Sequence, residues 1–159
     1  MSLLTREVCN MQYRHEMKYI CSEAQLSIFQ SRISCIMDID SHTSESNMYN
    51  IRSLYFDDYY NNAFYENQAG VDIREKFRIR IYDHNPNRIT LELKKKVHDK
   101  IQKIQCQLSI EQCKTLMEGQ PLKNSHNYPP VLQKLCTLMK TRLMRPVVIV
   151  EYDRTPYVY

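Results

Sequence analysis

The sequence predicts an α+β fold dominated by an antiparallel sheet, and three observations support this. Several stretches alternate apolar and charged residues with a period of two, as strands with one polar face do. Turn sequences such as His84-Asn85-Pro86-Asn87 join neighbouring strands directly, without the helical crossovers of a doubly wound fold. The 159 residues are enough for one core and too few for two.

The first predicted elements are a strand, a helix and a loop. Met11–Ile20 alternates as a strand with charged residues on one face. Ser22 and Gln25 have the spacing of a capping box, which predicts a helix running to about Met37. We expect the apolar stripe of this helix to pack in the core. Residues 38–47 are polar and turn-rich, as a surface loop is.

The middle of the chain contains most of the predicted sheet. Tyr49–Asp57 alternates as a strand, and the acidic pair Asp57-Asp58 then suits the start of a short helix that Gly70 ends. The stretch Arg74–Lys103 contains two strands around the predicted turn, and Lys100–Leu108 forms the next strand.

The last third is predicted to be helix, helix and strand. Ser109 and Gln112 form a second capping box, and Gly119 closes that helix. Pro129-Pro130 suits the start of a longer amphipathic helix. The segment Pro146–Tyr159 begins as a strongly apolar strand.

The composition is that of an ordinary globular protein, with 43% hydrophobic and 25% charged residues. The net charge of +4 is small, so an anionic partner needs a local cluster of cations. The six cysteines form no C-x-x-C pair, which favours reduced thiols and a cytoplasmic location. No secretion signal and no apolar run long enough for a membrane span occur in the sequence.

Common catalytic motifs are absent from the sequence. It contains no G-x-x-x-x-G-K-[ST], G-x-G-x-x-G, H-E-x-x-H or G-x-S-x-G, and the five histidines are scattered. What remains is a set of cations at alternate strand positions that can project from one side of one curved sheet: Lys18, Arg78, Arg80, Lys94, Lys103 and Arg154.

Six cations on one enclosed face would cost several kcal/mol each in desolvation unless anions accompany them. A phosphate chain would remove that cost, because Arg binds phosphate oxygens bidentately and Lys binds them as a point charge. Glu16 and Glu92 share this face and are candidate ligands for a divalent cation, although each can instead pair with a neighbouring lysine. The alternative is that the basic faces simply face water.

Five blocks of the sequence resemble the VTC domain, the polyphosphate polymerase domain of the vacuolar transporter chaperone family. They are RHEMKYI at 14–20, IRSLYFDD at 51–58, REKFRIRIY at 74–82, LELKKK at 91–96 and VVIVEYDR at 147–154. The blocks occur in order from Tyr13 onwards, and the arrangement is most similar to bacterial stand-alone members.

The resemblance implies a triphosphate tunnel (CYTH-like) fold, a closed antiparallel barrel with a basic interior and flanking helices. It implies transfer of the ATP γ-phosphate to polyphosphate with Mn²⁺ or Mg²⁺, and it makes Lys18, Arg78, Arg80, Lys94, Lys103 and Arg154 phosphate-binding residues. Family members continue past the strand near Tyr159 into further barrel strands. Because the resemblance begins at Tyr13, residues 1–12 are expected to be an extension. Residues 13–159 are expected to be the N-terminal two-thirds of the domain. The barrel would then be incomplete, and a second copy or a partner would complete it.

Three functions stay open at this point. The first is a polyphosphate polymerase-like domain that binds ATP and polyphosphate, and the second is a triphosphatase of the same fold. The third is a non-catalytic module that binds polyphosphate or another polyanion. Nucleic acid is not an expected partner, because aromatic residues are not interleaved with the cations as in known modules.

Overall fold

The structure, a computed structural model, describes residues 7–41, 43, 47–123 and 127–159, with the backbone alone for 7–14. The elements are, in order, β1 (Glu7–Arg14), α1 (Glu23–Ile33), β2 (Asp38–Ile39), β3 (Tyr49–Asp57), α2 (Asn62–Gln68), β4 (Ile73–Tyr82), β5 (Ile89–Val97), β6 (Lys100–Leu108), α3 (Ile110–Met117), α4 (Pro130–Thr141), β7 (Arg145–Arg154) and β8 (Tyr157–Val158).

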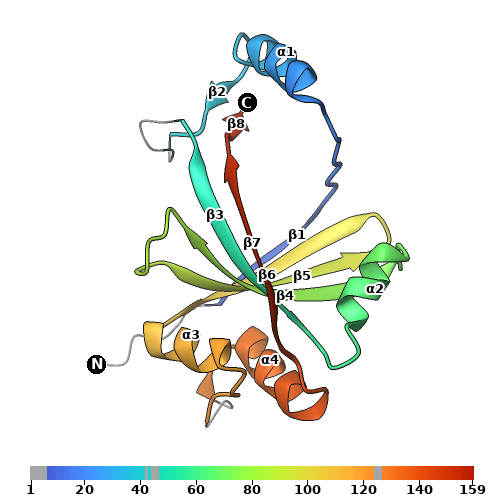
Figure 1. The fold of residues 1–159 in the computed structure, drawn as a ribbon, viewed down its shortest axis with the longest axis vertical. Helices are drawn as coiled ribbons and strands as arrows, with labels where there is room; N and C mark the ends of the chain where they lie inside the picture. The colour runs from blue at the N-terminus through green and yellow to red at the C-terminus, as the bar shows by residue number, and fades with distance from the viewer. Residues whose placement is uncertain (1–6, 42, 44–46, 124–126) are drawn as a thin grey trace.

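The main sheet has the strand order β1-β6-β5-β4-β3-β7, and every neighbouring pair is antiparallel. The strands twist strongly across the sheet, and β7 does not meet β1, so the barrel is open along these edges in the described part of the chain (Figure 1). The predicted α+β class with an antiparallel, incomplete barrel is confirmed. β1 begins at Glu7, so part of the expected extension pairs with β6.

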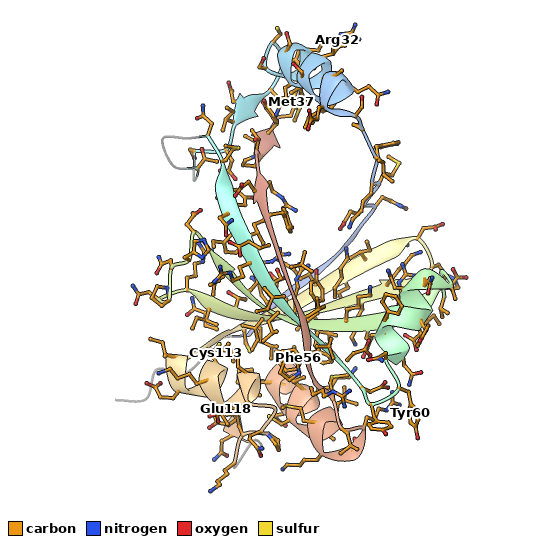
Figure 2. All side chains as sticks on the ribbon, in the orientation of Figure 1. Arg32, Met37, Phe56, Tyr60, Cys113 and Glu118 are labelled. Atoms are coloured by element: carbon orange, nitrogen blue, oxygen red, sulfur yellow. The ribbon has the colours of Figure 1, made fainter. Side chains whose placement is uncertain are left out.

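Two helices cover one face of the sheet and form the core with it. α3 and α4 lie together beneath the sheet in Figure 1, and Phe56 and Cys113 lie between the two layers in Figure 2. The apolar residues of β3, β4 and β5 alternate toward this layer, where Phe77 and Leu93 face each other across the ladder. Leu132 and Leu135 of α4 are fully buried against them.

Local signals are confirmed where a helix begins or ends. Both capping boxes are present, at Ser22 and at Ser109. Gly70 and Gly119 have φ of +71° and +75°, the left-handed conformation that glycine adopts after a helix. Asp57 accepts hydrogen bonds from the backbone N–H groups of Ala63 and Phe64, so its carboxylate holds the N-terminus of α2.

The first predicted strand, Met11–Ile20, is misplaced. The strand ends at Arg14, and residues 15–20 are irregular and exposed. The reason is that β1 pairs only with β6, and Arg14 lies opposite Ile101, close to the start of β6 at Lys100. Beyond that point no strand in the described part of the chain lies beside residues 15–20, so their regular alternation does not produce a strand.

The expected core packing of the first helix is wrong in this structure. α1 contains no buried residue, and Leu26 and Phe29 of its stripe are 48% and 57% exposed. Ile36, which the prediction placed in the helix, lies beyond its end at Ile33 and is 71% exposed. α1 lies at the end of the molecule opposite α3 and α4 (Figure 1). Amphipathic spacing indicates that a helix has an apolar face, and nothing within the described residues covers that face.

The final segment, predicted as one strand, is two. β7 ends at Arg154 and β8 resumes at Tyr157, where it pairs with β2 in a separate small sheet. Pro156 lies between them, and proline has no N–H to continue a ladder. β2 falls inside the predicted loop 38–47, since two residues are too few to give a periodic signal.

β7 forms an exposed apolar edge of the open barrel. Its residues Val147–Val150 are all between 41% and 57% exposed, although they form the middle of a ten-residue strand. β7 pairs with β3 on one side, and in the described chain its other side is an open edge.

No helix within the described residues combines the length and apolar character that crossing a membrane requires.

A pair of leucine substitutions distinguishes the core from the exposed helix. Leu132→Ala should lower the free energy of unfolding by about 2–5 kcal/mol, because it leaves a cavity between α4 and the sheet. Leu26→Ala, in α1, should change it by no more than about 0.5 kcal/mol. Urea unfolding followed by circular dichroism measures both. Equal losses would show that α1 is packed in the core in solution.

Candidate functional site

The face of the sheet turned away from α3 and α4 carries a cluster of charged side chains. Strand register places them side by side, since Ser53 lies opposite Arg80, Tyr55 opposite Arg78, and Arg78 in turn opposite Glu92. The same period of two that sends Phe77 and Leu93 into the core sends their neighbours to this face. We call it the charged face.

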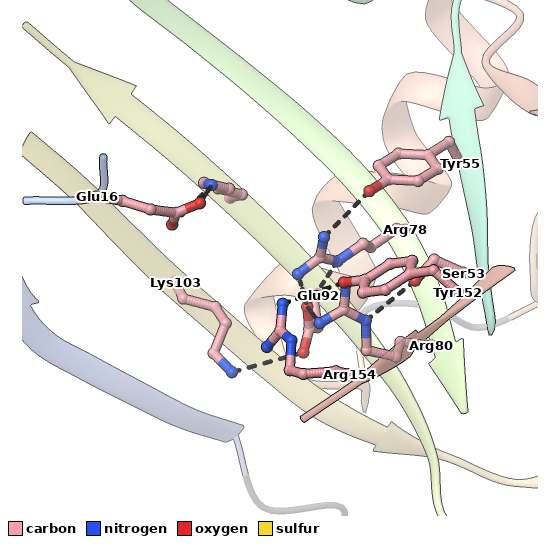
Figure 3. A network of polar contacts seen from close by, with 10 residues as sticks. Glu16, Ser53, Tyr55, Arg78, Arg80, Glu92, Lys103, Tyr152 and Arg154 are labelled. Carbon is pink, nitrogen blue, oxygen red and sulfur yellow. Dashed lines mark hydrogen bonds and ion pairs between the residues drawn. The ribbon is translucent and has the colours of Figure 1, made fainter. Parts of the chain in front are cut away.

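Glu92 of β5 is the centre of an ion-pair network on the charged face (Figure 3). Arg78 Nε donates to Glu92 Oε2 at 2.7 Å, and Arg78 Nη2 lies 2.6 Å from the same oxygen. Lys103 Nζ donates to Oε1 at 3.5 Å, and Arg80 Nη1 lies 3.9 Å from Oε2. One carboxylate therefore faces three cations from two neighbouring strands.

Polar and aromatic neighbours fix the two arginines from the other side. Arg78 Nη1 donates to the Tyr55 hydroxyl at 3.1 Å, and Arg80 Nε donates to Ser53 Oγ at 3.0 Å. The Arg80 guanidinium also lies 5.9 Å from the ring centroid of Tyr82. These contacts hold the planar guanidinium groups of Arg78 and Arg80 in fixed orientations on the charged face.

The pKa shifts in this network follow from its geometry. Burial alone would raise the pKa of Glu92, but the charges of Arg78, Lys103 and Arg80 outweigh it and hold that pKa below the ordinary value. Burial opposes the charge of Arg78 as well, and Glu92 and Tyr55 outweigh it, so the pKa of Arg78 is raised. The network therefore stabilises the charged forms of both Glu92 and Arg78.

A cleft of about 470 Å³ opens beside the network. Six cations line it, together with Glu16, Tyr55, Asn67 and Ile101: Lys18, Arg74, Lys76, Arg78, Lys94 and Lys96. Glu16 is the one carboxylate in its lining, and both of its oxygens accept from Lys94 Nζ at 3.0 Å. The cleft has far more positive than negative charge on its walls.

Crowding of these cations is visible at Lys76. Its pKa is lowered, first by burial and then by repulsion from Arg74, Lys94 and Lys18, against the opposing attraction of Asp57. The folded protein thus holds cations close together at a free-energy cost. An anion in the cleft would remove that cost.

The six cations predicted from the sequence are not all in one place. Arg78, Arg80 and Lys103 meet around Glu92, while Lys18, Arg78 and Lys94 line the cleft, so Arg78 belongs to both. Arg154 extends from β7 onto the same face in Figure 3, where its Nη2 donates to the Tyr152 hydroxyl at 3.2 Å. Glu16, in the irregular segment that follows β1, pairs with Lys94 of β5.

Sequence reasoning missed several residues of the site. Arg74, Lys76 and Lys96 line the cleft and fit the alternation of β4 and β5, so strand periodicity alone was sufficient to include them. Ser53 and Tyr55 were missed for another reason. Their roles as partners of the arginines depend on the register of β3 against β4, which no local pattern reveals.

The described residues do not fit a divalent metal held by the chain itself. They contain no group of three or more His, Cys, Asp or Glu side chains close enough to share an ion. The oxygens of Glu92 face Arg78 and Lys103, and those of Glu16 face Lys94. Cations in these positions would repel a metal ion from both carboxylates.

A comparison with known protein families shows to which family the chain belongs. The family model for the VTC domain matches residues 13–159. The chain belongs to the VTC domain family. The charged face of this VTC domain lies entirely within the matched residues, from Glu16 and Lys18 to Arg154.

Solved structures support the triphosphate tunnel fold for this VTC domain. A crystal structure from Bacillus halodurans, described as a "putative adenylate cyclase", is similar with a TM-score of 0.56 and 16% sequence identity. The similarity covers 98% of this chain and 66% of that chain, so this VTC domain spans about two-thirds of the length of that protein. Among curated proteins, no match is found.

Neutralising Lys76 should stabilise the protein when no anion is bound. Its lowered pKa means that the unfolded chain holds the proton more tightly, so stability rises with pH toward the ordinary value of 10.5. Lys76→Met removes the buried charge, and we expect a higher Tm at neutral pH and a smaller gain in Tm at alkaline pH.

Thermal melts across a pH series measure this effect. The control is Lys95→Met on the opposite face, where Lys95 pairs with Glu75 and its removal should not raise the Tm. A Tm for Lys76→Met at or below that of the wild type at neutral pH would contradict the account.

Proposed function

We propose that this VTC domain binds ATP and inorganic polyphosphate on its charged face and transfers the γ-phosphate of ATP to the polyphosphate chain. The observation that carries the proposal is the cleft, whose walls hold six cations and one carboxylate. Simple exposure of a basic face to water is the weaker explanation, because Arg80 and Glu92 lie on that face and yet are only 5% and 1% exposed.

Phosphoryl transfer needs positioning and charge stabilisation more than covalent participation of the protein. Arg78 is at once a wall of the cleft and a member of the network, so an anion in the cleft would meet a guanidinium already oriented by Glu92 and Tyr55. Lys94 and Lys18 would add point charges along the chain of phosphates. Lys103 and Arg154 lie on the same face and would add further positive charge.

Dependence on Mn²⁺ or Mg²⁺ stays a prediction, as does a cytoplasmic location. The family association favours a divalent ion, while the described carboxylates do not fit one. That mismatch supports a second candidate, a module that binds polyphosphate or another polyanion without turnover. It predicts salt-sensitive binding with no metal-dependent product.

Incubation of the purified chain with ATP and Mn²⁺ distinguishes these functions. A polymerase makes chains that are resolved by length on a gel, a triphosphatase of the same fold releases orthophosphate alone, and a binding module gives neither. Products from ATP that remain unchanged when the divalent ion is chelated would contradict the proposed use of a metal.

Binding of tripolyphosphate tests the site directly. Lys94→Ala should weaken it by roughly tenfold, the loss expected for one charge-assisted contact. Lys95→Ala is the matched control, because the two side chains are adjacent in β5 and 30% and 31% exposed but lie on opposite faces. Isothermal titration calorimetry measures both affinities. Equal losses in the two variants would mean that general basicity, and not the cleft, attracts the anion.

A further inference from the structure

Glu92 has a position that none of the expected roles explains. It is 1% exposed on a face built for anions, and its oxygens point at Arg78 and Lys103 instead of at an open coordination site. A buried carboxylate among cations carries the charge opposite to that of a phosphate-binding residue. The cations Arg78 and Lys103 that surround it would also repel a metal ion.

The contacts of Glu92 are those that a phosphoryl oxygen would make. Two nitrogens of Arg78 approach one carboxylate oxygen at 2.6 and 2.7 Å, the short distances of charge-assisted hydrogen bonds. The ammonium of Lys103 approaches the other oxygen from β6. A phosphate oxygen entering this part of the face would compete for the same donors.

Arg80 is left incompletely neutralised by this arrangement. Its side chain is 6% exposed, and its nearest carboxylate oxygen is 3.9 Å away, beyond hydrogen-bond distance. Nε donates to Ser53, and this is the one hydrogen bond that Arg80 makes to the described residues. Three cations share one carboxylate, so the cluster keeps a net positive charge even with Glu92 ionised.

We propose that Glu92 is an internal counter-anion, which positions Arg78 and Lys103 in the empty site and competes with a substrate phosphoryl group for their donors. This inference rests on the proposed function and deepens it. Glu92 acts through the cations, so it is a positioning residue. It keeps the buried guanidinium groups ordered before substrate arrives, and it lowers the affinity for the phosphate chain.

Two consequences follow from the competition. Without the carboxylate, the half-buried Arg78 and the buried Arg80 lose their counter-charge, so the empty protein loses stability. A bound polyanion supplies the missing charge and meets no repulsion from Glu92. Removing the charge therefore destabilises the empty protein and strengthens the binding of a polyanion.

The test compares Glu92→Gln with Glu75→Gln. Glu75 is matched because it lies on the neighbouring strand β4, pairs with Lys95 and Lys134, and points to the opposite face. The probe is tripolyphosphate, and the measurements are its affinity by calorimetry and its effect on Tm. A structural role alone would lower the Tm of both variants without changing how much tripolyphosphate raises it.

We expect Glu92→Gln to bind tripolyphosphate at least about tenfold more tightly than the wild type, the effect of removing one unit charge within roughly 12 Å at an effective dielectric near 20. The rise in Tm on adding tripolyphosphate should be larger in this variant than in the wild type. Glu75→Gln should match the wild type in both measurements.

Equal or weaker binding by folded Glu92→Gln, with binding by the wild type intact, would overturn the inference and leave the proposed function standing. If no protein binds tripolyphosphate, the proposed function fails as well. If Glu92→Gln is unfolded without the anion, added tripolyphosphate should restore its folded fraction, as seen by circular dichroism. Failure to restore it would also count against the inference.

Discussion

The ion pair between Glu92 and Arg78 is the contact on which the charged face depends. Strands β4, β5 and β6 all direct cations to one side, and like charges facing each other across a ladder destabilise a sheet. Lys94 lies opposite Lys103 in this way. One buried carboxylate, shared by cations from two strands, offsets part of that repulsion and allows the strands to pair in a single register.

The two faces of the sheet have opposite effects on stability. The apolar face is covered by α3 and α4, and its packing gives the fold its stability. The charged face holds more positive charge than its carboxylates neutralise, which costs free energy in the absence of an anion. Binding sites commonly hold such local cost where the rest of the fold is well packed. The proposed binding of phosphate chains uses this surplus of charge.

Sequence predicted those parts of the fold that local signals determine. The hairpin of β4 and β5, the capping boxes and the glycine helix ends all follow from patterns within a few residues. The end of β1 and the exposed stripe of α1 were not predictable in this way, because they depend on which distant element lies alongside. The same distinction between local and distant signals holds for the residues of the site. Alternation assigned Arg78, Arg80 and Lys94 to one face, whereas the pairing of Glu92 with Lys103 depends on the register between strands.

An anion bound at the arginines of the charged face is the central expectation, and nuclear magnetic resonance of the arginine side chains tests it most directly. The Nε–H groups of Arg78 and Arg80 have distinct partners, Glu92 and Ser53, so each should give a separate signal. Titration with tripolyphosphate should shift both signals and saturate at one equivalent. Signals that stay in place while the anion binds elsewhere on the protein would contradict the account.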